Sequence, residues 1–241
     1  MASAVKQENS SQKKDFALYL TPLCRSMPNK KALNKQYTLH KKMTTERKKI
    51  IAVILLILFL DQALKIWIKT TFTLGEDWQI TSWFHLHFIE NNGMAFGMEV
   101  ISKTFLSVFR IVAVAAIGYF IHVLLKKKYP FGFIACVAMI FAGALGNIID
   151  CVFYGLIFDA STPFSTATIF PVDGGYGTWL NGRVVDMLYF PLFRGVFPEW
   201  FPFWGGEEWE FFSPIFNLAD SAICIGVGYI IIFYNKILKQ F

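Results

Sequence analysis

The sequence has few charged residues. They make up 17% of its 241 residues, while hydrophobic residues make up 55%. Soluble domains carry about 25% charged residues, so this chain is short of solubilising surface. Its four cysteines are too few for a disulfide-stabilised scaffold. These shortages exclude a disordered chain, disfavour a water-soluble globule and predict a membrane protein.

Several motifs of common enzyme classes are also missing. HExxH and GxSxG do not occur, and no glycine-rich loop is present to hold a phosphate group. The four histidines show no ligand spacing with cysteine or aspartate, although His85 and His87 would share one face of a strand. We therefore predict no metal site and no cofactor, and the chemistry of aspartate is the class that remains.

Four apolar runs are long enough to cross a membrane: 50–68, 104–125, 131–149 and 214–234. The first run lacks the short apolar core and small-residue cleavage site of a signal peptide, so we expect it to be retained. The sequence predicts a mainly α membrane protein with four transmembrane helices and a small extracytoplasmic β-containing segment.

The charges predict the orientation. Of 23 basic residues, 17 lie in residues 1–49, in 126–128 or after the last run, whereas 14 of the 17 acidic residues follow residue 49. Lysine and arginine accumulate on the cytoplasmic side of membrane proteins. We expect both termini to be cytoplasmic, and nucleic acid is not an expected partner.

The predicted organisation has two parts. Residues 1–46 are polar and lysine-rich and predict a cytoplasmic, flexible tail, with Met43 as an alternative start. Residues 47–241 form the predicted four-helix domain, with outer-face segments 69–103 and 150–213. The second outer segment is rich in residues typical of the bilayer surface, namely Trp179, Trp200, Trp204 and Trp209.

Polar residues inside the apolar runs are the candidate functional residues, because such residues are costly in lipid. Asp61 and Lys65 stand at i, i+4 in the first run and indicate either an ion pair that orients helices or a functional site. Arg110 lies near the end of a run, where snorkelling explains it. Gly143 and Asn147 share one helix face, where a small residue admits another helix and an amide bonds across to it.

Two aspartates stand out near the fourth run. Asp220 lies about one and a half turns inside it, with Asn217 at i−3. Asp186 lies in an alternating, strand-like stretch just outside the membrane, where it would be a surface acid if taken alone. Two carboxylates that converge at a water–lipid boundary can share one proton and activate water to attack a peptide carbonyl.

At these residues the sequence resembles lipoprotein signal peptidase, or signal peptidase II, a family of bacterial inner-membrane aspartic proteases with four spans. The resemblance covers roughly 50–241. It rests on five blocks in the order of the family: LDQALK, ENNGMAFG, GALGNIID, RVVDM and FNLADS.

The resemblance implies that Asp186 and Asp220 are catalytic. It places supporting or substrate-binding roles on Asp61, Lys65, Asn91, Gly143, Asn147 and Asn217. It also implies a diacylglyceryl-modified prolipoprotein substrate, cut just before the lipidated cysteine near the periplasmic face of the inner membrane. Membrane lipid is the other implied partner, and we expect a monomer.

The sequence departs from the family pattern in three ways. Cys151 stands where the family usually has arginine, so Arg183, Arg194 or no residue replaces that guanidinium. The outer segments on both sides of Asp186 are longer than usual, and we expect these insertions to cover or dock the substrate. The extension 1–46 has no counterpart, and Met94 replaces a usual alanine.

Two other functions stay open. A four-span channel or transporter subunit would use Asp61, Lys65 and Asp220 to line an ion path and would not depend on Asp186. An inactive scaffold that binds lipoproteins is the second alternative, if Cys151 disables the site.

Overall fold

The computed structural model describes residues 30–92 and 103–239. The chain divides into two compact units, Met1–Glu46 and Arg47–Phe241. Helix α2 (Lys30–Thr71) begins within the segment predicted as a flexible tail. Residues 30–46 are therefore helical, in keeping with their several lysine residues. Met94 and the rest of the block from Gly93 to Gly97 lie outside the described residues.

Three helices are long and apolar enough to cross a membrane among the described residues: Lys41–Thr71 of α2, α3 (Lys103–Lys127), and Phe131–Ile157, which begins with α4 (Phe131–Ile149). They confirm the first three predicted runs as apolar helices. The fourth run contains α6 (Leu218–Phe233), which is apolar but has only 16 residues. A short helix, α7 (Asn235–Leu238), follows it.

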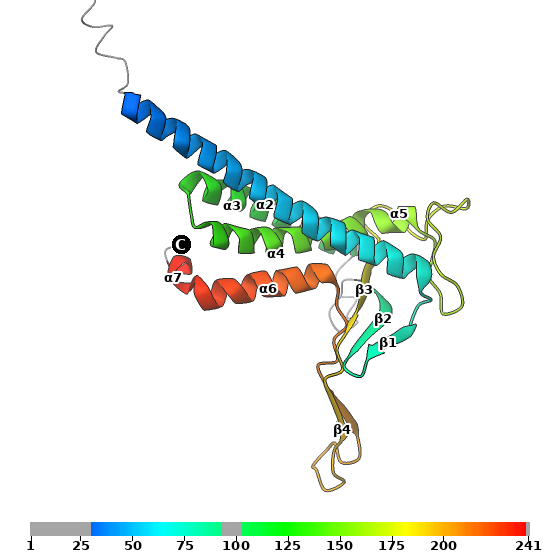
Figure 1. The fold of residues 1–241 in the computed structure, drawn as a ribbon. Coiled ribbons are helices and arrows are strands. Elements are labelled where there is room, and N and C mark those ends of the chain that lie inside the picture. The colour runs from blue at the N-terminus through cyan, green and yellow to red at the C-terminus, as the bar shows by residue number, and fades with distance from the viewer. Residues whose placement is uncertain (1–29, 93–102, 240–241) are drawn as a thin grey trace, which may run out of the picture. The chain divides into compact units, whose positions relative to one another are not determined.

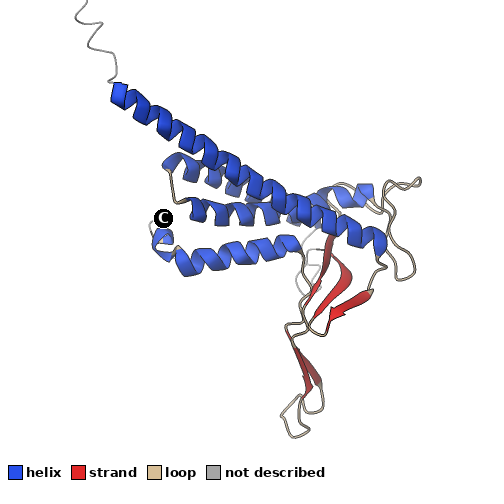
Figure 2. Ribbon diagram, viewed as in Figure 1, coloured by secondary structure: helices blue, strands red, loops and turns tan. Residues whose placement is uncertain are grey.

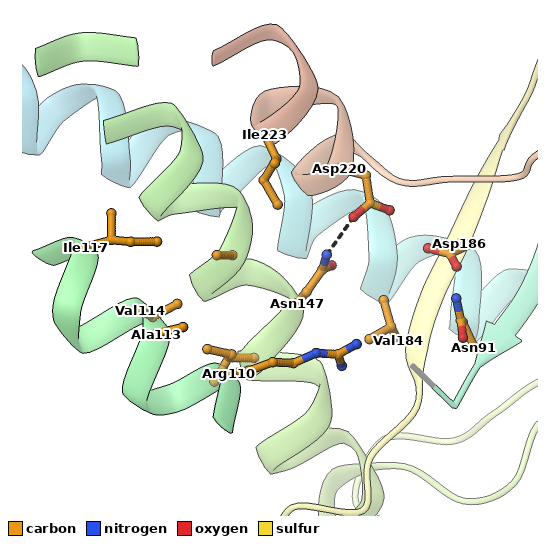
Figure 3. A pocket seen from close by; sticks show the side chains of 12 residues that line it. Asn91, Arg110, Ala113, Val114, Ile117, Asn147, Val184, Asp186, Asp220 and Ile223 are labelled. Carbon is orange, nitrogen blue, oxygen red and sulfur yellow. Dashed lines mark hydrogen bonds between the residues drawn. The ribbon is translucent and has the colours of Figure 1, made fainter. Parts of the chain in front are cut away.

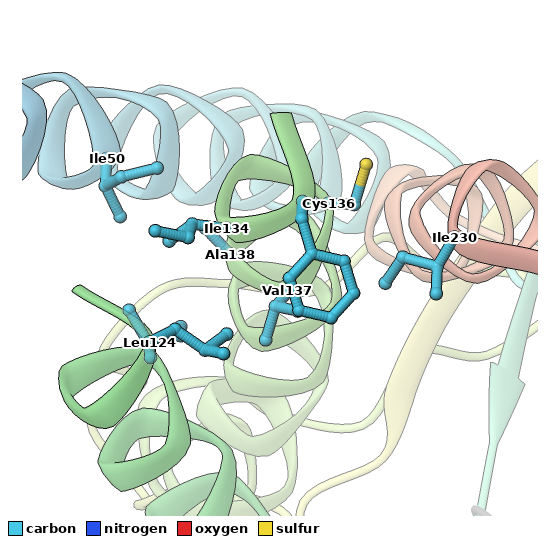
Figure 4. Close-up of a cluster of buried hydrophobic side chains, with 9 residues drawn as sticks. Ile50, Leu124, Ile134, Cys136, Val137, Ala138 and Ile230 are labelled. Atoms are coloured by element: carbon cyan, nitrogen blue, oxygen red, sulfur yellow. The ribbon is translucent and has the colours of Figure 1, made fainter. Parts of the chain in front are cut away.

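Helix α4 is the centre of the helical bundle. In the most apolar 18-residue stretch of Phe131–Ile157, half of the residues are buried, against 17% in the corresponding stretches of α2 and α3. Helix α4 packs against both α3 and α6 (Figure 1). One hydrophobic cluster joins the four long helices through Ile50, Leu124, Val137 and Ile230 (Figure 4). Large apolar side chains remain exposed on the outer faces of the helices, as lipid contact requires; these include Leu55, Phe59, Phe105, Val112 and Ile232.

A small sheet lies at the end of the helical bundle that is opposite to the C-terminus (Figure 2). Its antiparallel strands are β1 (Asp77–Thr81), β2 (Phe84–Asn91) and β3 (Val184–Tyr189), in that order. A separate hairpin pairs β4 (Phe193–Val196) with β5 (Glu208–Phe211). Val185 and Met187 of β3 pack into a second core cluster with Phe72 and Phe88. The side chain of Asp186 therefore points to the opposite face of the strand.

Helix α4 continues into a π-helical turn, η2 (Asp150–Tyr154), and a last helical turn, α5 (Gly155–Ile157). Asp150, the first residue of η2, is fully buried, and its carboxylate binds the ammonium group of Lys65 in α2 at 2.8 Å. Lys65 also binds Asp61, its i−4 neighbour, at 3.1 Å. The ion pair predicted between Asp61 and Lys65 is confirmed, and Asp150 is a second carboxylate for the same ammonium group.

A second buried ion cluster fixes the insertion that precedes Asp186, between α5 and β3. The Lys69 ammonium pairs with the Glu90 carboxylate of β2 and donates to the Ser161 hydroxyl at 2.9 Å. Arg183 donates to the other Glu90 oxygen at 2.9 Å, and the Ala167 amide bonds to the Lys69 carbonyl at 3.2 Å. These contacts attach the segment between α5 and β3 to the end of α2 and to β2.

Gly143 allows α4 and α6 to approach, as the sequence predicts. A Cβ atom at position 143 would collide with the Ala219 carbonyl oxygen and lie 2.8 Å from Ile223 Cγ1. We expect Gly143→Ala to lower the free energy of unfolding by about 1–3 kcal/mol, as overpacking does, and to impair activity by displacing α6. The matched control is Gly228→Ala, since a Cβ there meets nothing within 4 Å. Thermal unfolding in detergent compares the two; an equally stable Gly143→Ala variant would contradict this packing.

Lys65 is fully buried, and its replacement would leave two buried carboxylates without their cation. We expect Lys65→Met to lower the free energy of unfolding by about 3–5 kcal/mol, the usual effect of removing one partner of a buried ion pair. Adding Asp150→Asn to Lys65→Met should recover part of this loss because it removes one of the uncompensated charges. Urea unfolding of both variants tests the arrangement, and a double variant no more stable than Lys65→Met would speak against it.

Candidate active site

The chain entering α6 folds into a capping box. The Asn217 side chain accepts a hydrogen bond from the Asp220 amide at 2.9 Å, and the Asp220 carboxylate accepts from the Asn217 amide at 3.4 Å. This reciprocal pair begins the helix at Leu218. Asp220 therefore lies in the first turn of α6, because the helix begins at Leu218, four residues after the apolar run begins.

Asp186 is buried in the middle of β3. Its side chain is 2% exposed, so the interpretation as a surface acid is wrong. Asn217 Nδ2 donates to its Oδ1 at 2.6 Å, and the Asn91 side chain also hydrogen-bonds to it. Asn91 ends β2, which pairs with β3, so the sheet brings the ENNG and RVVD blocks together.

Asn147 of α4 connects the buried lysine to Asp220. Its Oδ1 accepts from Lys65 Nζ at 2.8 Å and from Asn217 Nδ2 at 3.2 Å, while its Nδ2 donates to Asp220 Oδ1 at 2.8 Å. An ammonium group only donates hydrogen bonds. Lys65 therefore fixes which end of the Asn147 amide faces Asp220, and the predicted hydrogen bond across helices is confirmed.

The surroundings of Asp186 favour its protonated form. Burial raises the pKa of Asp186 to about 7, and the nearby Asp220 carboxylate adds to the shift, while hydrogen bonds from Asn217 and Asn91 lower the pKa by less. One of two neighbouring carboxyl groups thus holds a proton near neutral pH. This is the arrangement in which one carboxyl group acts as an acid and the other as a base.

Both aspartates line one cavity of about 290 Å³ (Figure 3). Asn91, Asn147 and Arg110 supply its other polar side chains, and most of its remaining lining comes from the apolar side chains of Ala113, Val114, Ile117, Ala144, Ile148, Val184 and Ile223. No cluster of three or more His, Cys, Asp or Glu side chains suited to a metal ion occurs within residues 30–92 and 103–239. The cavity combines a polar end with room for an apolar ligand.

The guanidinium beside Cys151 belongs to Arg110 of α3, which the sequence did not suggest as a replacement for the arginine of the family. Arg183 pairs with Glu90, and Arg194 pairs with Glu210 in the hairpin, so neither lies beside Cys151. Arg110 Nη1 donates to Cys151 Sγ at 3.3 Å, and Arg110 lines the cavity. The interpretation of Arg110 as a snorkelling residue is therefore wrong.

The structure brings together most of the predicted site residues. Asp186, Asp220, Asn91 and Asn147 line the cavity, and Asn217 bonds to the two aspartates. The remaining predicted residues lie behind the cavity: Asp61, Lys65 and Gly143. Sequence reasoning missed Arg110, Asp150 and Glu90. The signal that the three share is an ionisable side chain within or directly beside an apolar run or one of the five family blocks.

The sequence matches known proteins of one family over most of its length. The family model described as signal peptidase (SPase) II matches residues 53–236. The chain is 52% identical over 190 residues to a lipoprotein signal peptidase of Porphyromonas gingivalis, covering 78% of this chain and 84% of that protein. It is 34% identical over 205 residues to a lipoprotein signal peptidase of Amoebophilus asiaticus, covering 82% of each.

Solved structures give the same picture of the fold. A bacterial membrane enzyme solved by the in meso method at 2.3 Å resolution aligns with a TM-score of 0.53 and 26% identity, over 78% of this chain and 88% of that chain. A second such structure, at 1.9 Å, aligns with a TM-score of 0.51 over 77% and 91%. The matching model spans well over half of the sequence and includes the cavity, so the chain belongs to the signal peptidase II family.

Proposed function

We propose that this protein removes the signal peptides of lipoproteins by aspartic catalysis, with Asp186 and Asp220 as the catalytic pair. The names of its relatives support the substrate class. One observation carries the chemistry: two carboxylates from different elements line one cavity, and the pKa of Asp186 is raised to about 7. The substrate we propose is a prolipoprotein with diacylglyceryl on the cysteine that follows the scissile bond.

In the proposed mechanism Asp220 is the base and Asp186 the acid. Asp220 takes a proton from a water molecule as that water attacks the carbonyl carbon of the scissile bond. Asp186 donates its proton toward the carbonyl oxygen, which stabilises the developing negative charge. As the tetrahedral intermediate collapses, Asp220 gives the proton it took from water to the leaving amine and the C–N bond breaks. Asp186 recovers its proton from a hydroxyl group of the intermediate, which leaves a carboxyl group on the released peptide. The assignment follows from the raised pKa of Asp186.

The other predicted residues position this pair. Asn147, oriented by Lys65, donates to Asp220, and Asn217 donates to Asp186 while capping the helix that carries Asp220. Asn91 contacts Asp186 from β2 and also lines the cavity. In this proposal Asn91 helps to hold the substrate segment next to Asp186.

We also propose four spans, a monomer, cytoplasmic termini and an active site near the periplasmic face of the bacterial inner membrane. The 16 residues of α6 extend about 24 Å at 1.5 Å per residue, somewhat less than a hydrocarbon core of about 30 Å. The apolar residues on either side of α6, within 214–217 and 234–238, lengthen the segment. The excess of lysine and arginine in residues 1–49 and 126–128 supports the orientation.

The alternatives receive less support. An ion path lined by Asp61, Lys65 and Asp220 does not match the cavity, because Asp61 and Lys65 do not line it. Instead, Lys65 pairs with Asp61 and with Asp150 behind the cavity. Asp186, which that path would not need, lies in the cavity. The inactive scaffold was an alternative because Cys151 replaces the arginine of the family. The Arg110 guanidinium lies beside Cys151, so a guanidinium is present there and this reason for an inactive site loses its support.

Replacing either catalytic aspartate tests the proposal. We expect Asp186→Asn and Asp220→Asn each to lower the cleavage rate at least about 10³-fold, because each removes a proton-transfer group. Signal-peptide release from purified diacylated prolipoprotein is measured by mass spectrometry. Asp173→Asn, in an exposed loop, is the matched control and should keep full activity. Cleavage at the wild-type rate by Asp186→Asn or Asp220→Asn would contradict the assignment of these two aspartates as the catalytic pair.

The rate should also depend on the proton of Asp186. Since the pKa of Asp186 is about 7, the acid form predominates below that pH and is lost above it. We expect kcat/KM to fall about tenfold per pH unit on the alkaline side. Asn91 lowers the pKa of Asp186 through its hydrogen bond, so Asn91→Ala should move this limb to higher pH. A rate that stays flat to pH 9 would rule out Asp186 as the acid.

A further inference from the structure

The α3 wall of the cavity begins with a cation and continues with apolar side chains. Arg110, Ala113, Val114 and Ile117 line the cavity at the spacing of one helix face (Figure 3). Arg110 is the only positively charged residue among the described residues that line it. A ligand lying along this face toward the aspartates would contact apolar surface and then a guanidinium group.

The position of Arg110 suggests a ligand-binding role. An arginine within an apolar helix is costly and commonly marks function. Its Nη1 donates to the Cys151 thiol at 3.3 Å, and a thiol is a weak acceptor. This contact holds the guanidinium at the cavity, which Arg110 lines. The planar guanidinium presents its N–H donors in a fixed fork, which suits two neighbouring oxygen acceptors.

We propose that Arg110 binds the ester carbonyl oxygens of the diacylglyceryl group on the substrate, while the acyl chains lie along Ala113, Val114 and Ile117. This inference rests on the proposed function and assigns a specificity-determining residue to it. In a diacylglyceryl group each ester carbonyl is followed directly by an apolar chain. The cavity wall has the same order, because the Arg110 guanidinium lies toward the aspartates and Ala113, Val114 and Ile117 lie farther from them (Figure 3).

Comparing two substrate peptides isolates the ester contacts. One carries ester-linked acyl chains on its lipidated cysteine, and the other carries ether-linked chains of equal length, which lack the carbonyl oxygens. Binding of fluorescent versions is measured by anisotropy with the full-length Asp220→Asn protein, so that turnover does not interfere. The same background then receives Arg110→Met, Arg110→Lys or, as matched control in the hairpin, Arg194→Met.

We expect the Asp220→Asn protein to bind the ester peptide about tenfold more tightly than the ether peptide, the effect of one or two hydrogen bonds to a charged group. Arg110→Met should weaken ester binding about tenfold and abolish the preference. Arg110→Lys should keep part of the preference, and Arg194→Met all of it.

Two results would overturn the proposal. Equal binding of the two peptides to Asp220→Asn would mean that the ester carbonyls are not recognised, whatever the Arg110 variants do. An unchanged preference in Arg110→Met, with a melting temperature near that of its parent, would assign the recognition to another residue. Cleavage by Asp220→Asn is monitored separately and would refute the catalytic pair without changing the ester–ether comparison.

Discussion

The buried ammonium group of Lys65 binds three oxygen-bearing side chains, and the geometry of the site depends on it. Asp61 and Asp150 pair with it, and Asn147 accepts a hydrogen bond from it. Each of the two carboxylates also accepts a backbone amide: Asp61 from Ala219 at 2.9 Å and Asp150 from Val185 at 3.3 Å. Those amides directly precede Asp220 and Asp186 in the chain. One cation thus sets the positions of both catalytic candidates relative to α2 and α4.

Such a cluster is an expensive way to hold helices together. Burying charges costs several kcal/mol per ion, and apolar replacements of buried ion pairs are often neutral or stabilising. Apolar side chains in place of Asp61, Lys65 and Asp150 would pack the helices but would not bind the amides of Val185 and Ala219 or orient the Asn147 amide. We interpret the cluster as a device for precise positioning, in line with the requirement that catalytic groups be held to within about 0.5 Å.

The sequence predicts local features well, because local features depend on periodicity and composition. Three long apolar helices, the strand at Asp186 and the close approach at Gly143 all follow from spacing along the chain. The start of α6 was misplaced because the length of an apolar run contains no information about the capping box at Asn217.

What the sequence could not predict depends on contacts between distant segments. Asp150 is separated from Lys65 by the whole of α3 and the whole of α4, and Arg110 meets Cys151 from 41 residues away. The role of Arg110 at the cavity was overlooked because snorkelling is a sufficient explanation for an arginine near the end of an apolar run. Only the packing of α3 against α4 shows that its face is directed to the cavity.

The two aspartates have different local structures, and this difference supports their different roles. Asp220 stands in the first turn of α6, where its carboxylate completes the capping box with Asn217. Asp186 lies in a strand, which has little net dipole, and is almost completely buried. Burial in the sheet thus gives Asp186 surroundings that Asp220, at the start of a helix, does not share. In the proposed mechanism this difference assigns the role of acid to Asp186, whose pKa is raised by burial, and leaves the role of base to Asp220.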